Sequence, residues 1–166
     1  MSKLSHMAIG ACALVALAEA FEFSLPGAAE TSDGFIRLLP EQAPFKSPLG
    51  AGPSQAVIYG DPSKPGIYVV RNRFPPGAHS NPHFHSQDRH ATVIKGVWYT
   101  GVGEKIDFDS AIPLKEGSYM LHPANAVHWD GAGAEEVVVQ IIGVGPVTTT
   151  PAGAPGPQDG HWPKPK

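Results

Sequence analysis

Four of the eight histidines in this 166-residue chain fall within one short stretch, HSNPHFHSQDRH, at positions 79–90. His83 and His85 are two residues apart, and such residues point to the same side of a β-strand. Two imidazoles directed at one point favour a transition-metal site, because imidazole suits Zn, Cu, Fe and Ni. The alternative interpretation is a solvated, polar turn. His79, in the loop before the pair, fits no ligand position.

Two further histidines are candidates for the same site. His90 opens the strand-like run HATVIKG, in which His90, Thr92 and Ile94 share one face. If that face is inward, His90 enters the same interior as the histidine pair. His128 lies about 40 residues further along, after a proline-containing turn in the segment GSYMLHPANAVHWDG.

Short runs rich in Val, Ile, Tyr and Trp occupy the middle of the chain, and segments rich in Gly and Pro separate them. This pattern predicts an all-β fold, an antiparallel sandwich or barrel. Outside the N-terminus no run shows sustained helical periodicity. The strand-like runs are AVIYG, GIYVVRNRF, HATVIKGVWYTG, GSYML, AVHWDG and EEVVVQIIGVG.

The N-terminus has the features of a secretory signal peptide. Lys3 gives a positive start, an apolar run at 7–17 is too short to span a bilayer, and small residues follow in A-x-A form. We therefore predict a signal peptide at 1–20 and a periplasmic or secreted protein; the alternative is a buried N-terminal helix. If the signal is removed, the only cysteine goes with it, and no disulfide can form.

The remaining chain divides into three parts by composition. The segment 21–55 is mixed in character and predicts an extended N-terminal arm. The β-rich segment 56–145 is expected to form the barrel or sandwich domain. From residue 146 to 166, Pro, Gly and Thr dominate, which is typical of a loosely draped tail.

The histidines stand at fixed distances from glycines and a proline. Gly77 is followed by five residues and then by HFH at 83–85; four more residues lead to His90. Downstream, five residues separate Gly117 from Pro123, and four more lead to the last histidine of the set. This arrangement resembles the two-part motif of the cupins, G-x5-H-x-H-x4-E followed by G-x5-P-x-G-x2-H. The resemblance covers about residues 55–145 and implies a cupin double-stranded β-helix, which is a jelly-roll barrel.

The resemblance also implies a set of metal ligands, namely His83, His85, His90 and His128. The chain departs from the family pattern at one of them, because His90 stands where many cupins have a glutamate. The other register would place Arg89 there, and arginine cannot ligate a metal under ordinary conditions. We favour His90, because this choice keeps the parity of the strand that follows.

Four neutral imidazoles would leave the 2+ charge of a divalent ion uncompensated. Such a site should attract an anionic substrate or an enolate, and it disfavours Mg and Ca, which prefer oxygen ligands. We expect Fe, Ni, Cu or Zn, with Mn less favoured. The predicted function is metal-dependent chemistry on a small anionic or oxygen-rich molecule, such as that of a dioxygenase or an isomerase. The alternatives are a non-catalytic periplasmic metal- or ligand-binding cupin and a barrel held by structural zinc.

Several other side chains are candidates for the substrate pocket. Arg73 could hold a carboxylate bidentately if it faces inward, and is an ordinary solvated charge if it faces outward. Trp98 and Tyr119 either line the cavity or belong to the core. Gln140 interrupts the apolar run VVVQIIG and needs a hydrogen-bond partner if buried. His122 could border the mouth of the barrel, although a loop position fits it better.

The charge of the chain limits its partners. The formal net charge is −3, and Lys and Arg together number only 12, which argues against the basic face that nucleic-acid binding needs. We expect a small-molecule ligand or substrate and no membrane association after signal removal. The family resemblance suggests a homodimer, and exposed edge strands would give it a physical motive.

Overall fold

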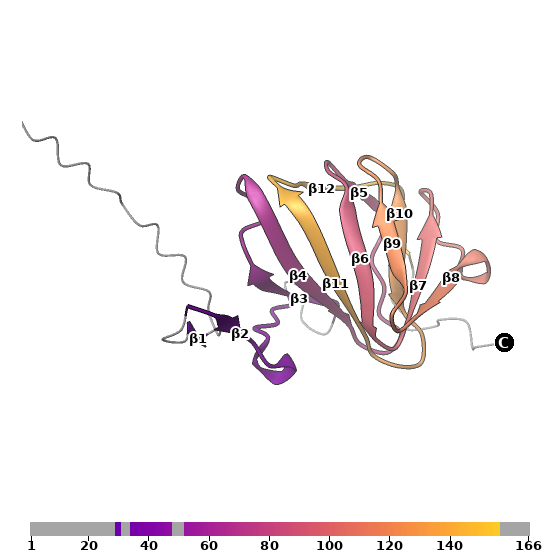
Figure 1. The fold of residues 1–166 in the computed structure, drawn as a ribbon. Coiled ribbons are helices and arrows are strands. Elements are labelled where there is room, and N and C mark those ends of the chain that lie inside the picture. Colours follow the sequence, from indigo (N-terminus) through magenta and orange to yellow (C-terminus); the bar gives the residue numbers. More distant parts are fainter. Residues whose placement is uncertain (1–28, 31–33, 48–51, 157–166) are drawn as a thin grey trace, which may run out of the picture.

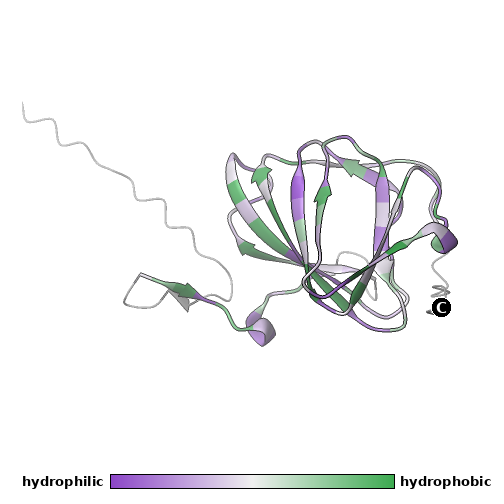
Figure 2. Cartoon of the chain, turned by 45° about the vertical axis from the view of Figure 1, so that its right-hand side comes forward, coloured by the Kyte–Doolittle hydropathy of each residue, from purple (hydrophilic) through white to green (hydrophobic). Residues whose placement is uncertain are grey.

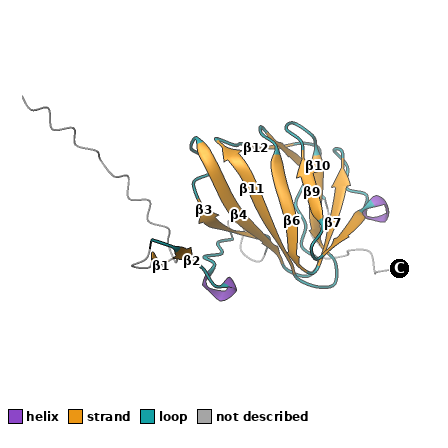
Figure 3. Ribbon diagram, in the orientation of Figure 1, coloured by secondary structure: helices purple, strands orange, loops and turns teal. Residues whose placement is uncertain are grey.

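The computed structural model describes residues 29–30, 34–47 and 52–156, and strands dominate them (Figure 1). Figure 3 shows that the helical elements are short turns, and they are the 3₁₀ helices η1 (Pro40–Gln42) and η2 (Phe108–Ser110). No helix in the described part is long and apolar enough to cross a membrane. The strands are β1 (Ala29–Glu30), β2 (Ile36–Arg37), β3 (Ser54–Tyr59), β4 (Gly66–Phe74), β5 (His83–His85), β6 (Arg89–Lys95), β7 (Val97–Val102), β8 (Ile112–Lys115), β9 (Tyr119–His122), β10 (His128–Ala132), β11 (Val137–Gly145) and β12 (Thr149–Pro151).

Two five-stranded antiparallel sheets build the domain. The first sheet has the order β12-β5-β10-β7-β8 and the second has the order β3-β4-β11-β6-β9, while β1 pairs with β2 separately. The sheets face each other, because one hydrophobic core combines Trp98 and Ala132 of the first with Tyr68 and Ile141 of the second. Most neighbours within a sheet are distant in the chain, as in a jelly roll. The predicted all-β jelly-roll barrel is therefore confirmed.

The strands of the second sheet bury alternate side chains. Along β6, Ala91 and Val93 are buried and Thr92 is exposed. Along β11, Val139 and Ile141 are buried in the same core. Figure 2 shows this alternation of hydrophobic and hydrophilic residues along the strands. Each fully buried aliphatic side chain stabilises the fold by about 1.5–3 kcal/mol, so the alternation decides which polar residues of these strands face the interior.

The strands of the barrel extend beyond the predicted bounds of 56–145 on both sides. β3 begins at Ser54, and β12 lies in the segment expected to be a tail. β12 pairs with β5 and sets Thr149 opposite His85. A part of the expected tail thus belongs to the sheet that carries the histidine pair. The predicted signal peptide at 1–20 lies outside the described residues.

Candidate metal centre

Three histidines meet on the inner side of the first sheet because of the strand register. His83 and His85 lie on β5, and His128 opens β10 directly opposite His83. The ring centroids are 4.5 Å apart for His83 and His128, 4.8 Å for His83 and His85, and 5.3 Å for His85 and His128. One ligand atom from each ring lies within 4.8 Å of the other two, which is close enough for one ion to contact all three.

Backbone carbonyl groups orient two of these rings. Nδ1 of His83 donates to the carbonyl oxygen of Asn81 at 2.7 Å, and Nδ1 of His128 donates to that of Ala126 at 2.9 Å. A carbonyl oxygen only accepts, so in each neutral ring Nδ1 carries the proton and Nε2 keeps its lone pair. Nε2 of His128 has no partner among the described residues. Metal-binding histidines are commonly oriented by such a bond to the far nitrogen.

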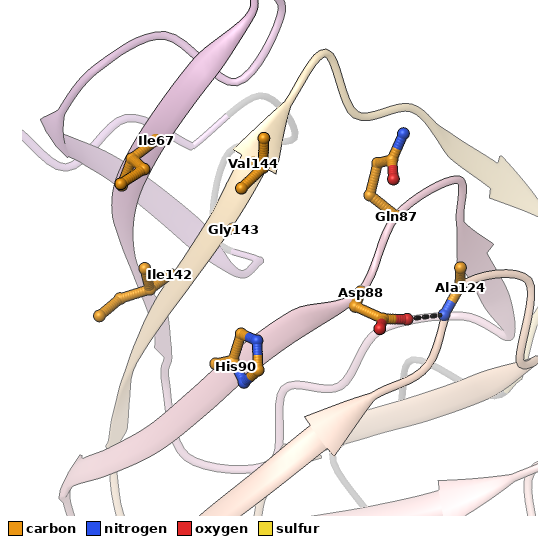
Figure 4. A pocket seen from close by; sticks show the side chains of 8 residues that line it. All are labelled: Ile67, Gln87, Asp88, His90, Ala124, Ile142, Gly143 and Val144. Carbon is orange, nitrogen blue, oxygen red and sulfur yellow. Dashed lines mark hydrogen bonds between the residues drawn. The ribbon is translucent and has the colours of Figure 1, made fainter.

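His90 does not join the cluster, so the expectation that it faces the interior is wrong. Arg89 and Ala91 of β6 are buried, whereas His90 between them is exposed. Nδ1 of His90 shares a hydrogen bond of 2.8 Å with the hydroxyl group of Tyr119. Figure 4 shows His90 in a different pocket, together with Ile142 and Val144, and the strand pairing sets His90 opposite Ile142. The reason is the alternation along β6, which directs the neighbouring arginine inward.

Arg89 therefore takes the inward position on β6 beside the histidine cluster, although the motif spacing sets His90 at the place of the glutamate. The side chain of Arg89 is 8% exposed, and its Nη1 donates to Nε2 of His85. Nδ1 of His85 is in turn hydrogen-bonded to Oγ1 of Thr149 at 3.0 Å. Arg89 forms no ion pair with any described residue, and its Nε has no hydrogen-bond partner among them. The histidine cluster thus has a buried cation as its direct neighbour.

His122 is a further member of the cluster, which sequence reasoning had assigned to a loop. It ends β9, lies opposite Arg89 of β6 and is 2% exposed. Its ring stacks on His128, with centroids 4.0 Å apart and planes 16° apart. Neither of its ring nitrogens has a hydrogen-bond partner within the described ranges. His79, which fits no ligand position in the sequence, is buried and forms a β-bridge with Gly131 of β10.

One carboxylate also lies in the interior. Asp130 follows His128 by two residues on β10, and its Oδ1 accepts a hydrogen bond from the hydroxyl group of Ser80 at 3.2 Å. His122, His128 and Asp130 form a second group whose ligand atoms lie within 4.8 Å of one another. His128 offers one lone pair, since its Nδ1 is bound to a carbonyl, and can serve only one group at a time.

A cavity of about 270 Å³ adjoins the cluster. His83, His85, Arg89 and Asp130 all line it, so a molecule in this cavity can touch the histidines and the guanidinium group together. A larger hollow of about 460 Å³ lies beside His90 on the outer surface (Figure 4), and its lining includes no member of the cluster. The smaller cavity is therefore the candidate substrate site. The other residues that line it are Pro53, Ser54, Gln55, Asn72, Phe74, Ser80 and Thr149.

Two predicted pocket residues face away from this cavity. Nε of Arg73 donates to the hydroxyl group of Ser54 at 3.3 Å, and its guanidinium lies 4.3 Å above the ring of Phe45. Gln140 accepts a hydrogen bond of 3.2 Å from Nε of Arg71. Both predicted residues lie on the side of their strands opposite to the core residues. Contrary to the prediction, neither lines the cavity.

The two predicted aromatic residues have different surroundings. Trp98 is 1% exposed and belongs to the hydrophobic core, as the alternative interpretation held. The edge of its ring system meets His122 at a centroid distance of 5.5 Å, so it packs behind the cluster. Tyr119 is 60% exposed and hydrogen-bonds to His90. Tyr119 is therefore an outer-surface residue and not a pocket residue.

Burial lowers the pKa of three of the clustered histidines, His85, His122 and His128. Burial, together with the neighbouring Arg89 cation, lowers the pKa of His85 to about 2. At His128, Asp130 opposes the lowering of the pKa by burial. A neutral imidazole is the form that binds a metal. The interior therefore presents these rings ready for ligation at neutral pH.

We expect the metal-free protein to lose stability as the pH falls below about 6.5. His85 stays neutral in the folded state, whereas the unfolded chain takes up a proton near pH 6.5. The unfolded state then binds more protons, so the free energy of unfolding should fall by about 2 kcal/mol for each such histidine between pH 6.5 and 5. Urea unfolding in the presence of a chelator measures this. A His85→Asn variant should show a shallower fall, and a flat profile in the unsubstituted protein would contradict the buried neutral state.

The donor set fits a divalent transition ion. The unpartnered Nε2 of His128 and the two unpartnered nitrogens of His122 are buried polar atoms, which need an explanation such as an ion or a water molecule. Imidazole ligands suit Fe, Ni, Cu and Zn better than they suit Mg or Ca. The residues present are thus appropriate for the kind of ion expected from the sequence.

The fold and the histidine cluster together place this chain in the class of jelly-roll proteins that have a candidate metal centre inside the barrel. The family model described as Cupin matches residues 61–152, which is more than half of the chain and includes every clustered histidine. The chain belongs to the cupin family. No curated protein matches the chain in sequence.

Solved structures share the fold at low sequence identity. The polyketide cyclase RemF from Streptomyces resistomycificus has a TM-score of 0.57 and 12% identity, over 69% of this chain and 83% of that one. A cupin-like protein from Thermotoga maritima has a TM-score of 0.51 and 22% identity, over 79% and 89%. A structure of DMSP lyases has a TM-score of 0.48 and 19% identity, over 57% of this chain and 48% of that one. The present chain thus spans about half the length of that protein. These likenesses concern the fold alone.

Proposed function

We propose that this cupin binds a divalent transition metal and acts on a small anionic or oxygen-rich organic molecule. The ligands are His83, His85 and His128, and the ion is Fe, Ni, Cu or Zn. The observation that carries the proposal is the convergence of these three rings beside a cavity of about 270 Å³. His122 and Asp130 form a second group with His128, which would hold an ion in place of the two β5 histidines.

The metal ion and the backbone carbonyl groups near the cavity would have different roles. When bound, the ion would polarise an oxygen of the ligand as a Lewis acid, and Fe, Ni or Cu would add redox chemistry with dioxygen. Asn81 and Ala126 hold the rings of His83 and His128 through their carbonyl oxygens. Those bonds fix the direction of the ligating nitrogens and prevent the rings from turning away.

Metal analysis of the purified protein, combined with turnover assays, tests this proposal. We expect about one equivalent of Fe, Ni, Cu or Zn per chain, together with oxygen consumption or product formation on a panel of β-diketones, phenols and keto acids. Tight metal binding without turnover on any of these compounds favours the non-catalytic metal- or ligand-binding protein. Unfolding of the domain on chelation favours a structural zinc instead. Failure to retain any of the four metals overturns the proposal.

Two further parts of the proposal concern the setting of the protein. We place it in the periplasm or outside the cell, and the charge and apolar pattern of residues 1–20 supports this. The outer face of the second sheet exposes Ile67, Ile142 and Val144, which supports a homodimer through that face. Cell fractionation tests the first, and light scattering of the purified protein tests the second.

A further inference from the structure

Arg89 is a buried cation in the interior of the barrel. It forms no ion pair within the described ranges, and its Nε has no hydrogen-bond partner there. Burial lowers the pKa of Arg89, while Tyr68 and the carboxylate of Asp130 oppose this shift. That carboxylate is hydrogen-bonded to Ser80. A buried charge without a partner is costly, and its surroundings normally supply one. A ligand that brings an anionic group to Arg89 would remove this cost.

The cavity beside Arg89 is suited to such a ligand. Apart from the histidines, Arg89 and Asp130 are the basic and acidic residues in its lining, one of each sign, so their formal charges cancel. A bound divalent ion would then give the cavity a net charge of about 2+, which attracts anions. The guanidinium group presents a planar fork of donors that matches the two oxygens of a carboxylate. Neutral polar groups of Asn72 and Thr149 also line the cavity.

The contact between Arg89 and His85 links the anion site to the metal site. Nη1 of Arg89 donates to Nε2 of His85, which is the ring nitrogen not engaged by Thr149. One lone pair cannot serve a guanidinium donor and a metal ion at once. A metal ion on His85 therefore frees this donor of Arg89, and an anion on Arg89 draws the donor away from His85. Each event favours the other, and linkage requires the effect to be reciprocal.

We propose that Arg89 binds the carboxylate of the substrate, and that the substrate is a small 2-oxo or 2-hydroxy acid. The carboxylate pairs with the guanidinium group, and the second oxygen, on the adjacent carbon, faces the histidines that line the same cavity. The assignment of that second oxygen rests on the proposed metal function. The pairing of the carboxylate with Arg89 rests on the buried cation and the cavity.

A matched pair of probes tests this inference without requiring turnover. Pyruvate carries the carboxylate and the 2-oxo group, and pyruvamide replaces the carboxylate by a neutral amide of similar size. Both are titrated by calorimetry into the zinc-loaded and the metal-free protein at one ionic strength. The variants are Arg89→Gln and Arg89→Lys, and the matched control is Arg71→Gln, which removes a cation whose partner is Gln140 on the outer face. Thermal melting and zinc content are recorded for every sample.

We expect the unsubstituted protein and Arg71→Gln to prefer pyruvate to pyruvamide by about 10- to 100-fold, as hydrogen bonds to a charged group imply. Arg89→Gln should abolish this preference, and Arg89→Lys should retain part of it. Zinc should tighten pyruvate binding, and pyruvate should tighten zinc binding by the same factor.

Equal binding of pyruvate and pyruvamide by the unsubstituted protein would overturn the inference. This comparison uses the unsubstituted protein alone, so it does not depend on the folding of a variant. A full preference retained in Arg89→Gln would overturn it as well. The metal proposal fails separately, if the unsubstituted protein retains no metal. In that case a preference for pyruvate in the metal-free protein that depends on Arg89 still supports the carboxylate site.

Discussion

Replacing His85 by alanine is expected to weaken zinc binding by about 100-fold. Structural zinc sites with four ligands have binding free energies of about 10–16 kcal/mol. Each ligand therefore contributes about 3 kcal/mol, which is a factor of about 100 in affinity. His85 contributes one of the three converging ligand atoms, and Nδ1 of its ring is hydrogen-bonded to Thr149. Competition with a chromophoric chelator measures the affinity, and circular dichroism establishes that the variant is folded.

His90→Ala is the matched control for this experiment. His90 is a histidine of the neighbouring strand, but it is exposed and bonds to Tyr119 on the outer face. Its removal should leave the zinc affinity within about twofold of the original, a change of less than 0.5 kcal/mol. An equal loss of affinity in both variants would show that His90 reaches the metal and that the inward face of β6 is wrongly assigned. An unchanged affinity in His85→Ala would remove the paired histidines from the ligand set.

The histidine pair could be predicted from sequence because its geometry is local. His83 and His85 share a side of any strand that contains them, and β5 does contain them. His128 was found through the spacing of its motif, since no local rule brings it to the pair. Its position opposite His83 depends on how β10 pairs with β5. This pairing is a non-local property, which a family motif records and residue periodicity does not.

The reversal at His90 has a physical cause that the sequence only partly reveals. Both alternations of RHATVIK contain apolar residues, so periodicity alone does not choose between the faces. Arginine cannot ligate a metal under ordinary conditions, which favoured His90. The structure instead buries Ala91 and Val93 in the core, and Arg89 shares their side of the strand. The available signal in the sequence was that His90 shares its side of the strand with Thr92. A threonine that faces the core is less favourable than an alanine or valine.

His122 was missed because its segment carries no alternation. The residues before it in β9 are Tyr119, Met120 and Leu121, and all are compatible with either face. The direction of His122 is decided by pairing with β6, where it lies opposite the inward Arg89. The partner of Gln140 was also non-local, since Arg71 lies on the neighbouring strand β4. Such contacts depend on strand order, which local sequence patterns do not determine.

Replacing Arg89 by glutamate is expected to tighten zinc binding by about 100-fold. Arg89 contacts His85 directly, so its cation lies beside any ion bound to that ring. Unit charges 4 Å apart interact by about 4 kcal/mol at an effective dielectric constant of 20. The substitution turns a repulsion into an attraction, and the desolvation of a buried carboxylate offsets much of the gain. A net gain of about 3 kcal/mol is therefore expected, which is a factor of about 100.

Arg89→Gln separates the loss of the cation from the gain of the carboxylate. It removes the positive charge without adding a ligand, so its zinc affinity should lie between those of the arginine and glutamate forms. The same chelator competition measures all three proteins, and Arg71→Gln again controls for net charge, because Arg71 bonds to Gln140 on the outer face. A glutamate variant that binds zinc no more tightly than the original protein would place Arg89 away from the ion. An affinity that rises from the arginine form through the glutamine form to the glutamate form would show that the arginine at this position weakens the metal site.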